Sequence, residues 1–405
     1  MLMFKRLRAL RTNENILIAT DVLLSSKSSF MNVFLMAYMI NVSLESSPVN
    51  FIIYCIVRYT AMGVFAICLL SFFRKHPLAA WRFSMVFSIL EVLGIILLDS
   101  TTVYYPYILA VLNAAESSLY WRPKIHFDVS EVPDNRRIRF RGTTTILTEI
   151  VKIIMPIVLG FAIGTTGYTN AAFIILAISA IQLVLSLCFH PTTESRTKPH
   201  SLKKVYEMII KHESLRKLIG LSFVRGWVIC SSAYLVISQI LLYRNVDSSM
   251  DLGIFTSLSA VIAIISVMIY RKLNTKRAQK TMILTFLPAV ILLPLMLIFF
   301  PHNSILAIAM YVFMQSIVNG LFDGTITMAR LEGILGTHLK DPSYRMEVDC
   351  LTEVALTVGR ILGFSMLLFF IIMGWEQYII WLAFVESLFV IPWYAIVIPK
   401  KHSYN

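Results

Sequence analysis

The chain has 405 residues, of which 57% are hydrophobic and only 15% are charged. About a quarter of a soluble domain is charged, so this composition excludes an ordinary aqueous globule and favours a lipid bilayer as solvent. The formal net charge is +13, but the basic residues fall in short bursts between apolar runs, without a Gly-rich phosphate loop or interleaved aromatics. This pattern argues against a nucleic-acid partner and is typical of charges that orient membrane helices.

A membrane-spanning helix needs about 20 mostly apolar residues. Twelve such stretches are predicted, at 16–42, 49–72, 83–98, 102–121, 144–165, 168–189, 218–243, 252–270, 281–300, 304–326, 350–373 and 377–398. The basic segment from Lys5 to Arg11 leads into the first of them without a small-residue cleavage site. We therefore expect a cytoplasmic tail and a retained first helix rather than a signal peptide.

Loop charges give the expected orientation. With twelve spans and a cytoplasmic amino terminus, the inside loops hold 30 of the 36 lysines and arginines, and the outside loops hold one, Arg244. Cytoplasmic loops are enriched in lysine and arginine, and a miscounted helix would invert the pattern along the rest of the chain. The sequence thus predicts a multi-pass protein of the cell membrane with both termini in the cytoplasm.

The chain is predicted to consist of two halves. The longest polar stretch, 191–217, separates an amino-terminal six-helix bundle at 1–190 from a carboxy-terminal one at 218–405. Within this cytoplasmic linker, the segment 202–216 is expected to form a short amphipathic helix at the membrane surface.

An internal repeat supports a duplication. The segments 141–150 and 345–354 share an arginine, five further residues, Leu-Thr-Glu and then a β-branched apolar residue, and they begin the fifth and eleventh predicted helices. Matching positions in two six-helix halves are typical of transporters built from structural repeats.

Two six-helix halves, cytoplasmic termini and a long basic central loop resemble the major facilitator superfamily. The loop 72–82 resembles the superfamily's signature between helices two and three because it keeps the basic residues of that signature, but it lacks the glycines and the acidic residue. The matching loop of the second half, 270–277, departs from the signature in the same way. Pro156 and Gly160 resemble the Gly-Pro motif of superfamily antiporters. The segment Phe30–Leu35 resembles the sequences of a poorly characterised bacterial branch of the superfamily. The resemblance implies a central cavity lined by helices one, four, seven and ten, and alternating access by rocking of the two halves.

Charged residues inside the predicted spans are the candidate functional groups. A charge in the bilayer costs roughly 2.5–3.5 kcal/mol on insertion scales, so each needs a partner, a wet cavity or a role. Proton coupling is expected from carboxylates in a partly dry cavity, and the candidates are Asp21, Glu116 and Asp323. The candidates for substrate contact are Lys27, Arg225 and Trp227. Glu91 and Glu386 lie in helices expected at the periphery and are interpreted as packing against other polar groups.

A second interpretation assigns the charges to structure. Salt bridges at the cytoplasmic gate explain the balance of acids and bases equally well, and the predicted gate network consists of Arg141, Glu149, Lys152, Arg345, Glu353 and Arg360. Glu149 and Lys152 are spaced i,i+3 on one helix face, where opposite charges attract.

Neither catalytic residues nor a cofactor are predicted. The five cysteines form no C-x-x-C or Cys/His cluster that favours a metal, and no enzyme motif is present. The leading hypothesis is a monomeric secondary transporter of a small organic solute in contact with membrane lipids, coupled to protons or another ion. Two alternatives stay open: a lipid or lipid-precursor flippase of the same fold, and a non-transporting membrane sensor or partner protein.

Overall fold

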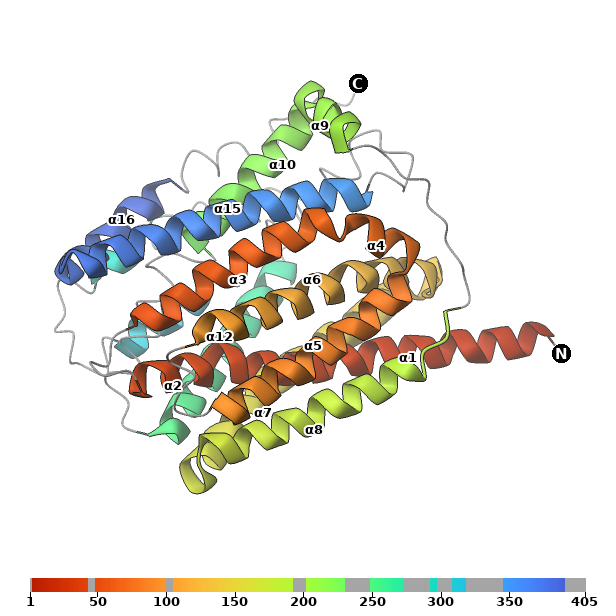
Figure 1. Cartoon of the computed structure of the whole chain (residues 1–405), viewed down its shortest axis with the longest axis horizontal. Helices are drawn as coiled ribbons and strands as arrows, with labels where there is room; N and C mark the ends of the chain where they lie inside the picture. The colour runs from red at the N-terminus through yellow and green to blue at the C-terminus, as the bar shows by residue number, and fades with distance from the viewer. Residues whose placement is uncertain are drawn as a thin grey trace. The chain divides into compact units, whose positions relative to one another are not determined.

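The computed structural model describes residues 2–42, 48–98, 105–191, 202–229, 248–272, 288, 292–296, 308–317 and 345–389, and every regular element among them is helical (Figure 1). The first helices are α1 (Leu2–Ser29), η1 (Phe30–Phe34), α2 (Leu35–Val42), α3 (Val49–Cys68), α4 (Leu70–Lys75), α5 (Pro77–Leu98), α6 (Pro106–Ser130), α7 (Asp134–Thr166) and α8 (Tyr168–Leu187). The later ones are α9 (Leu202–Lys211), α10 (Glu213–Val224), η3 (Arg225–Ile229), α12 (Ser249–Lys272), α15 (Arg345–Ile372), η5 (Glu376–Tyr378) and α16 (Ile379–Leu388).

Local sequence signals set several helix boundaries. Pro77 and Pro106 begin α5 and α6, at a position where a helix needs no backbone N–H and the fixed φ of proline is favourable. Gly167 adopts a φ of +89° between α7 and α8, which a residue with a Cβ rarely tolerates. Between these signals the chain is helical because a helix satisfies its own backbone hydrogen bonds in lipid.

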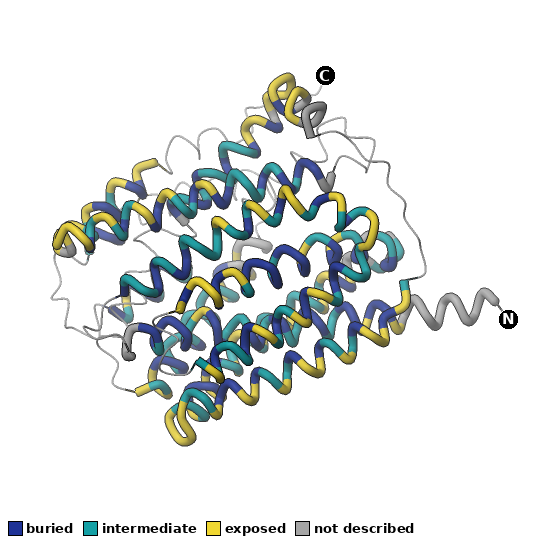
Figure 2. The backbone as a smooth tube through the Cα atoms, viewed as in Figure 1, coloured by how far each residue is buried: buried dark blue, intermediate teal, exposed yellow. Residues whose placement is uncertain are grey.

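Six of the described helical segments are long and apolar enough to cross a membrane: Val49–Cys68, Pro77–Leu98, Arg139–Thr166, Tyr168–Leu187, Ser249–Ser266 and Glu347–Ile372. The predicted span at 16–42 is helical as part of α1 with η1 and α2, and the predicted span at 102–121 is helical from Pro106 on, as α6. Helices α1 and α6 carry six of the ten buried charged residues in the described part of the chain: Glu14, Asp21, Lys27, Glu116, Lys124 and Asp128. Large apolar side chains on these helices face outward, among them Leu97 and Ile372, which are 82% and 68% exposed (Figure 2). A surface of this kind is stable in lipid rather than in water.

The predicted amphipathic helix at 202–216 is two helices. The backbone is extended at His212, with φ −104° and ψ 112°, so α9 ends at Lys211 and α10 begins at Glu213. The break lets Ile209 of α9 and Leu218 of α10 pack into one apolar cluster with Val348 of α15. The predicted spans at 218–243, 281–300, 304–326 and 377–398 are described only in part.

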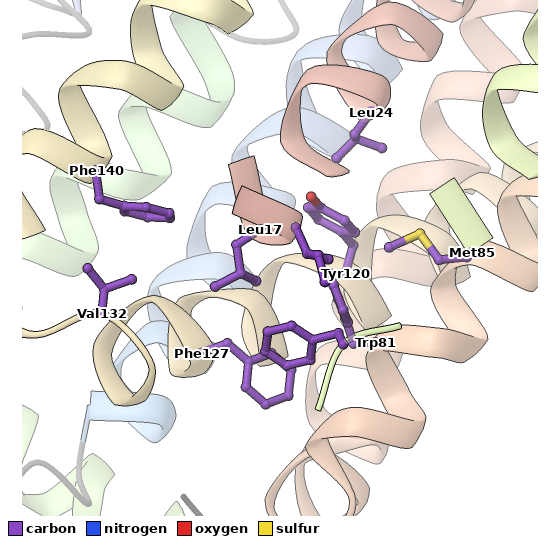
Figure 3. Packing of buried hydrophobic residues seen from close by; sticks show 10 residues of the cluster. Leu17, Leu24, Trp81, Met85, Tyr120, Phe127, Val132 and Phe140 are labelled. Carbon is purple, nitrogen blue, oxygen red and sulfur yellow. The ribbon is translucent and has the colours of Figure 1, made fainter. Parts of the chain in front are cut away.

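By internal contacts the chain divides into two compact units: residues 1–199 with 247–257, and residues 200–246 with 258–405. In the first unit an aromatic cluster joins α1, α5, α6 and the end of α8 (Figure 3). The Trp81 ring lies edge-on to Phe127 and Phe189, with ring centroids 5.8 and 5.1 Å apart, and Tyr120 packs against the same tryptophan. This cluster fixes α6 against α1 and α5, which is the arrangement that positions the charged site.

Two short π-helical turns, η1 and η3, interrupt long helices. Phe30–Phe34 separates α1 from α2, and Arg225–Ile229 continues α10. Such turns shift the helical register and occur frequently at functional sites. Lys27, a predicted substrate contact, lies three residues before η1, and Arg225, another predicted contact, is the first residue of η3.

Candidate binding and coupling site

A buried lysine on α1 binds two carboxylates from different helices. Lys27 Nζ lies 2.6 Å from Glu91 Oε2 of α5 and also donates a hydrogen bond to Glu116 Oε2 of α6. Lys27 and Glu91 are 2% and 0% exposed. Removing an ion from water costs several kcal/mol unless close opposite charges compensate, so the three groups depend on one another. With both acids ionised the trio carries one net negative charge, which a single proton neutralises.

The trio borders a small cavity between α1, α3 and α6. The cavity has a volume of about 80 Å³, and Lys27, Glu116, Arg58, Asn113 and Ser117 supply its polar lining. Glu91 does not line this cavity, but it shares the Lys27 ammonium with Glu116. A ligand in this cavity therefore meets both cations and Glu116 directly, and Glu91 only through Lys27.

A second ion-paired group lies farther along the same face of α6. Glu116, Tyr120, Lys124 and Asp128 follow one another at intervals of four residues, which aligns them along one stripe of a helix. The Tyr120 hydroxyl donates to Asp21 Oδ1 of α1 at 2.6 Å, and Lys124 Nζ lies 2.5 Å from Asp21 Oδ2 and 2.9 Å from Asp128 Oδ2. Asp21 and Lys27 thus both contact the α6 stripe, each through an ion pair.

In the second unit, Glu386 of α16 is buried beside Trp227. The Trp227 indole Nε1 donates to Glu386 Oε1 at 3.1 Å, and the Trp227 ring lies 4.8 Å from that of Phe389. Glu386 is 1% exposed. The structure therefore brings one predicted substrate residue, Trp227, into contact with an acid that the sequence had placed at the periphery, and Arg225 stands two residues away in η3.

Four of the six predicted gate residues form pairs within their own helices. Lys152 Nζ lies 2.7 Å from Glu149 Oε1 on α7, and Arg360 lies 3.7 Å from Glu353 on α15. The glutamates of the two sequence repeats thus each have a basic partner farther along the same helix. Arg141 is exposed near the start of α7.

Two predicted site residues are not placed by side-chain geometry. Asp323 lies outside the described residues, and Arg345 is described only as the first residue of α15. Within the described part of the chain, no group of three or more His, Cys, Asp or Glu side chains is arranged to hold a metal ion.

Three participants were not among the predicted site residues: Glu91, Arg58 and Glu386. The signal was available, since a charge within a span is costly wherever the helix lies in the bundle. Glu91 was assigned by analogy to a peripheral helix, yet it is fully buried against Lys27. The sequence does not contain the rotation of α5 about its axis, which decides whether that residue faces lipid or a neighbouring helix.

Long apolar helices with ion-paired charges buried between them are typical of a multi-pass membrane protein. The family model described as Major Facilitator Superfamily matches residues 129–332, half of the chain, and the chain belongs to this superfamily. The match confirms the resemblance drawn from the topology and the loops. It also confirms that the protein is a transporter and not an enzyme.

Solved structures share the fold over nearly the whole chain. A bacterial homologue of the iron transporter ferroportin in an inward-facing state has a TM-score of 0.62 and 12% identity, covering 97% of this chain and 99% of that one. A variant of the nucleoside transporter NupG has a TM-score of 0.68 and 12% identity, covering 96% and 99%. At such identity the likeness shows the fold alone. No curated protein matches the sequence significantly.

Proposed function

We infer that the protein is a secondary active transporter that moves a small organic solute across the cell membrane by alternating access. The proposed topology has twelve spans, cytoplasmic termini, and two six-helix bundles at 1–190 and 218–405 joined by a linker at 191–217. The superfamily match and the loop charges support this topology. The proposed working unit is a monomer in contact with membrane lipids.

The observation that carries the coupling proposal is the buried trio of Lys27, Glu91 and Glu116. Its single excess negative charge is removed when one carboxylate takes up a proton, and Lys27 is then held by one acid instead of two. Glu116 is the proposed proton acceptor because it also lines the cavity that a solute would enter. Binding of solute and binding of a proton therefore act on the same charges, which is the physical requirement for coupling them.

The remaining candidates have supporting roles in this proposal. Asp21 pairs with Lys124 at a second level of the same helix face and is a further proton-coupling candidate, as is Asp323. Arg225 and Trp227 are the proposed solute contacts of the second half, and the indole is already oriented by Glu386. The pairs of Glu149 with Lys152 and of Glu353 with Arg360 are proposed gate elements, together with Arg141 and Arg345.

The test is uptake into proteoliposomes under an imposed pH gradient, with a radiolabelled panel of carboxylates, amines, amino acids, nucleosides and ferrous iron. Nucleosides and iron are included because the solved structures of this fold include a nucleoside transporter and a bacterial homologue of an iron transporter. We expect accumulation of one class that stops when the gradient is collapsed. Glu116→Gln should abolish uphill accumulation but keep solute exchange, because it resembles the permanently protonated state.

Other outcomes separate the alternatives. Accumulation that the pH gradient does not affect would refute proton coupling and leave another ion as the driver. If the panel is not transported and a fluorescent lipid crosses the bilayer instead, the protein is a flippase. Failure of both would favour a sensor or partner protein that keeps the fold.

A further inference from the structure

Arg58 of α3 is a half-buried cation that has no ion-paired carboxylate among the described residues. Among the described residues no Asp or Glu oxygen lies within ion-pair distance of its guanidinium, and its Nε has no hydrogen-bond partner. Its one close aromatic contact is the Tyr59 ring, 5.4 Å from the guanidinium carbon. The nearby lysines differ, because Lys27 and Lys124 each bind two carboxylates. The guanidinium therefore keeps hydrogen-bond donors that no carboxylate of the described residues accepts, and a ligand that brings a carboxylate to it would gain charge-assisted hydrogen bonds.

Arg58 lines the same 80 Å³ cavity as Asn113 and Ser117. A guanidinium, an amide and a hydroxyl together offer the hydrogen-bond donors that a planar oxyanion accepts. Met31 and Trp121 also line the cavity, and their apolar and aromatic side chains suit a short hydrocarbon or ring. The lining thus offers polar groups for a carboxylate and apolar groups for the rest of the solute.

Charge counting selects an anion of one unit. Lys27, Arg58, Glu91 and Glu116 sum to zero when all are ionised, so a bound monoanion leaves one excess negative charge. One proton taken up by the glutamate pair restores neutrality. A phosphate monoester, with a charge of about −1.5 to −2 at neutral pH, leaves charge uncompensated. The site is therefore matched to one carboxylate together with one proton.

We propose that the transported solute is a small organic monocarboxylate whose carboxylate binds Arg58 and whose entry is accompanied by one proton on the Glu91 and Glu116 pair. This inference rests on the proposed function and specifies its substrate class. Arg58 contacts the solute, and Asn113 and Ser117 orient it.

The experiment is isothermal titration calorimetry of the full-length purified protein at constant chloride, with butyrate and benzoate as probes. Butyramide and benzamide are matched neutral ligands, and inorganic phosphate is the dianionic comparison. Titrations in two buffers of different ionisation enthalpy count the protons bound with each ligand. We expect both carboxylates to bind with about one proton each, and both amides and phosphate to bind at least tenfold more weakly.

Arg58→Gln should raise the Kd for the carboxylates about 10- to 100-fold, as expected for the loss of hydrogen bonds to a charged group. Arg58→Lys should retain part of the affinity, because it keeps the charge but not the fork geometry. Arg139→Gln is the matched control, since it removes an exposed arginine of the same unit outside this cavity, and its Kd should equal that of the wild type.

Thermal unfolding with and without butyrate distinguishes binding from structure. If Arg58 serves a ligand, butyrate raises the melting temperature of the wild type by mass action but not that of Arg58→Gln. Equal affinity for carboxylates and amides, unchanged affinity in Arg58→Gln, or an equal butyrate-induced shift in both proteins would each overturn the inference. Gradient-driven uptake of another solute class in the liposome panel would leave the transporter proposal standing and reject the monocarboxylate alone.

Discussion

Replacing Lys27 with methionine should destabilise the folded protein by about 3–5 kcal/mol, the usual cost of removing one partner from a buried ion pair. The upper half of that range is expected, because the ammonium neutralises two carboxylates at once and the Lys27 and Glu91 side chains are 2% and 0% exposed. Methionine is of similar length and leaves little cavity, so the lost stability reports charge rather than packing.

The assay is thermal unfolding in detergent at a fixed scan rate, since membrane proteins often unfold irreversibly. Lys152→Met is the control, because its pair with Glu149 is 51% exposed on the lysine side and exposed pairs contribute about 0–1 kcal/mol. The double variant Lys27→Met with Glu91→Gln should recover part of the lost stability, because it removes one of the two orphaned charges. Additive losses in the double variant, or equal melting temperatures for Lys27→Met and Lys152→Met, would refute the reasoning.

Two further predictions concern close contacts in the second unit, one at Gly359 and one at Trp227. Gly359→Ala should lower the melting temperature strongly, because a Cβ there meets the backbone carbonyl of Phe223. Gly142→Ala is the control and should not lower it, because a Cβ at that position has nothing within 4 Å. Equal melting temperatures for the two variants would contradict the close helix crossing at Gly359. Trp227→Phe should cost about 1–3 kcal/mol by leaving the buried Glu386 oxygen without its donor, and unchanged unfolding of that variant would contradict the hydrogen bond. In Trp227→Phe the additional variant Glu386→Leu should restore stability, because it removes the orphaned acid.

The sequence predicted the character of the fold well because lipid imposes simple rules. Apolar runs of about 20 residues and a bias of basic loops are properties of short segments, so the helices at Val49–Cys68 and Tyr168–Leu187 appear close to their predicted bounds. The break at His212 was not predictable from the amphipathic pattern, because it depends on how Ile209 and Leu218 share one cluster with a distant helix.

The site was predictable by residue type but not by partner. Lys27, Asp21 and Glu116 were identified because charges in spans are rare and costly, and all three are buried in ion pairs. Their partners depend on helix rotation and depth, which a single sequence does not record. Glu91 and Arg58 show this most clearly. Glu91 completes the trio with Lys27 and Glu116, whereas Arg58 has no ion-paired acid among the described residues.

The two ion-paired groups on α6 hold α1 and α6 together at two levels. Lys27 pairs with Glu116, and Asp21 pairs with Lys124, so α1 and α6 exchange the sign of the charge that each contributes at the two levels. The levels are eight residues apart on α6, roughly 12 Å at 1.5 Å per residue. A slide by one turn would place each lysine beside the wrong neighbour at both levels simultaneously. Relative motion of these helices is therefore disfavoured, and under the proposed coupling a proton on Glu116 would weaken only the level that borders the cavity.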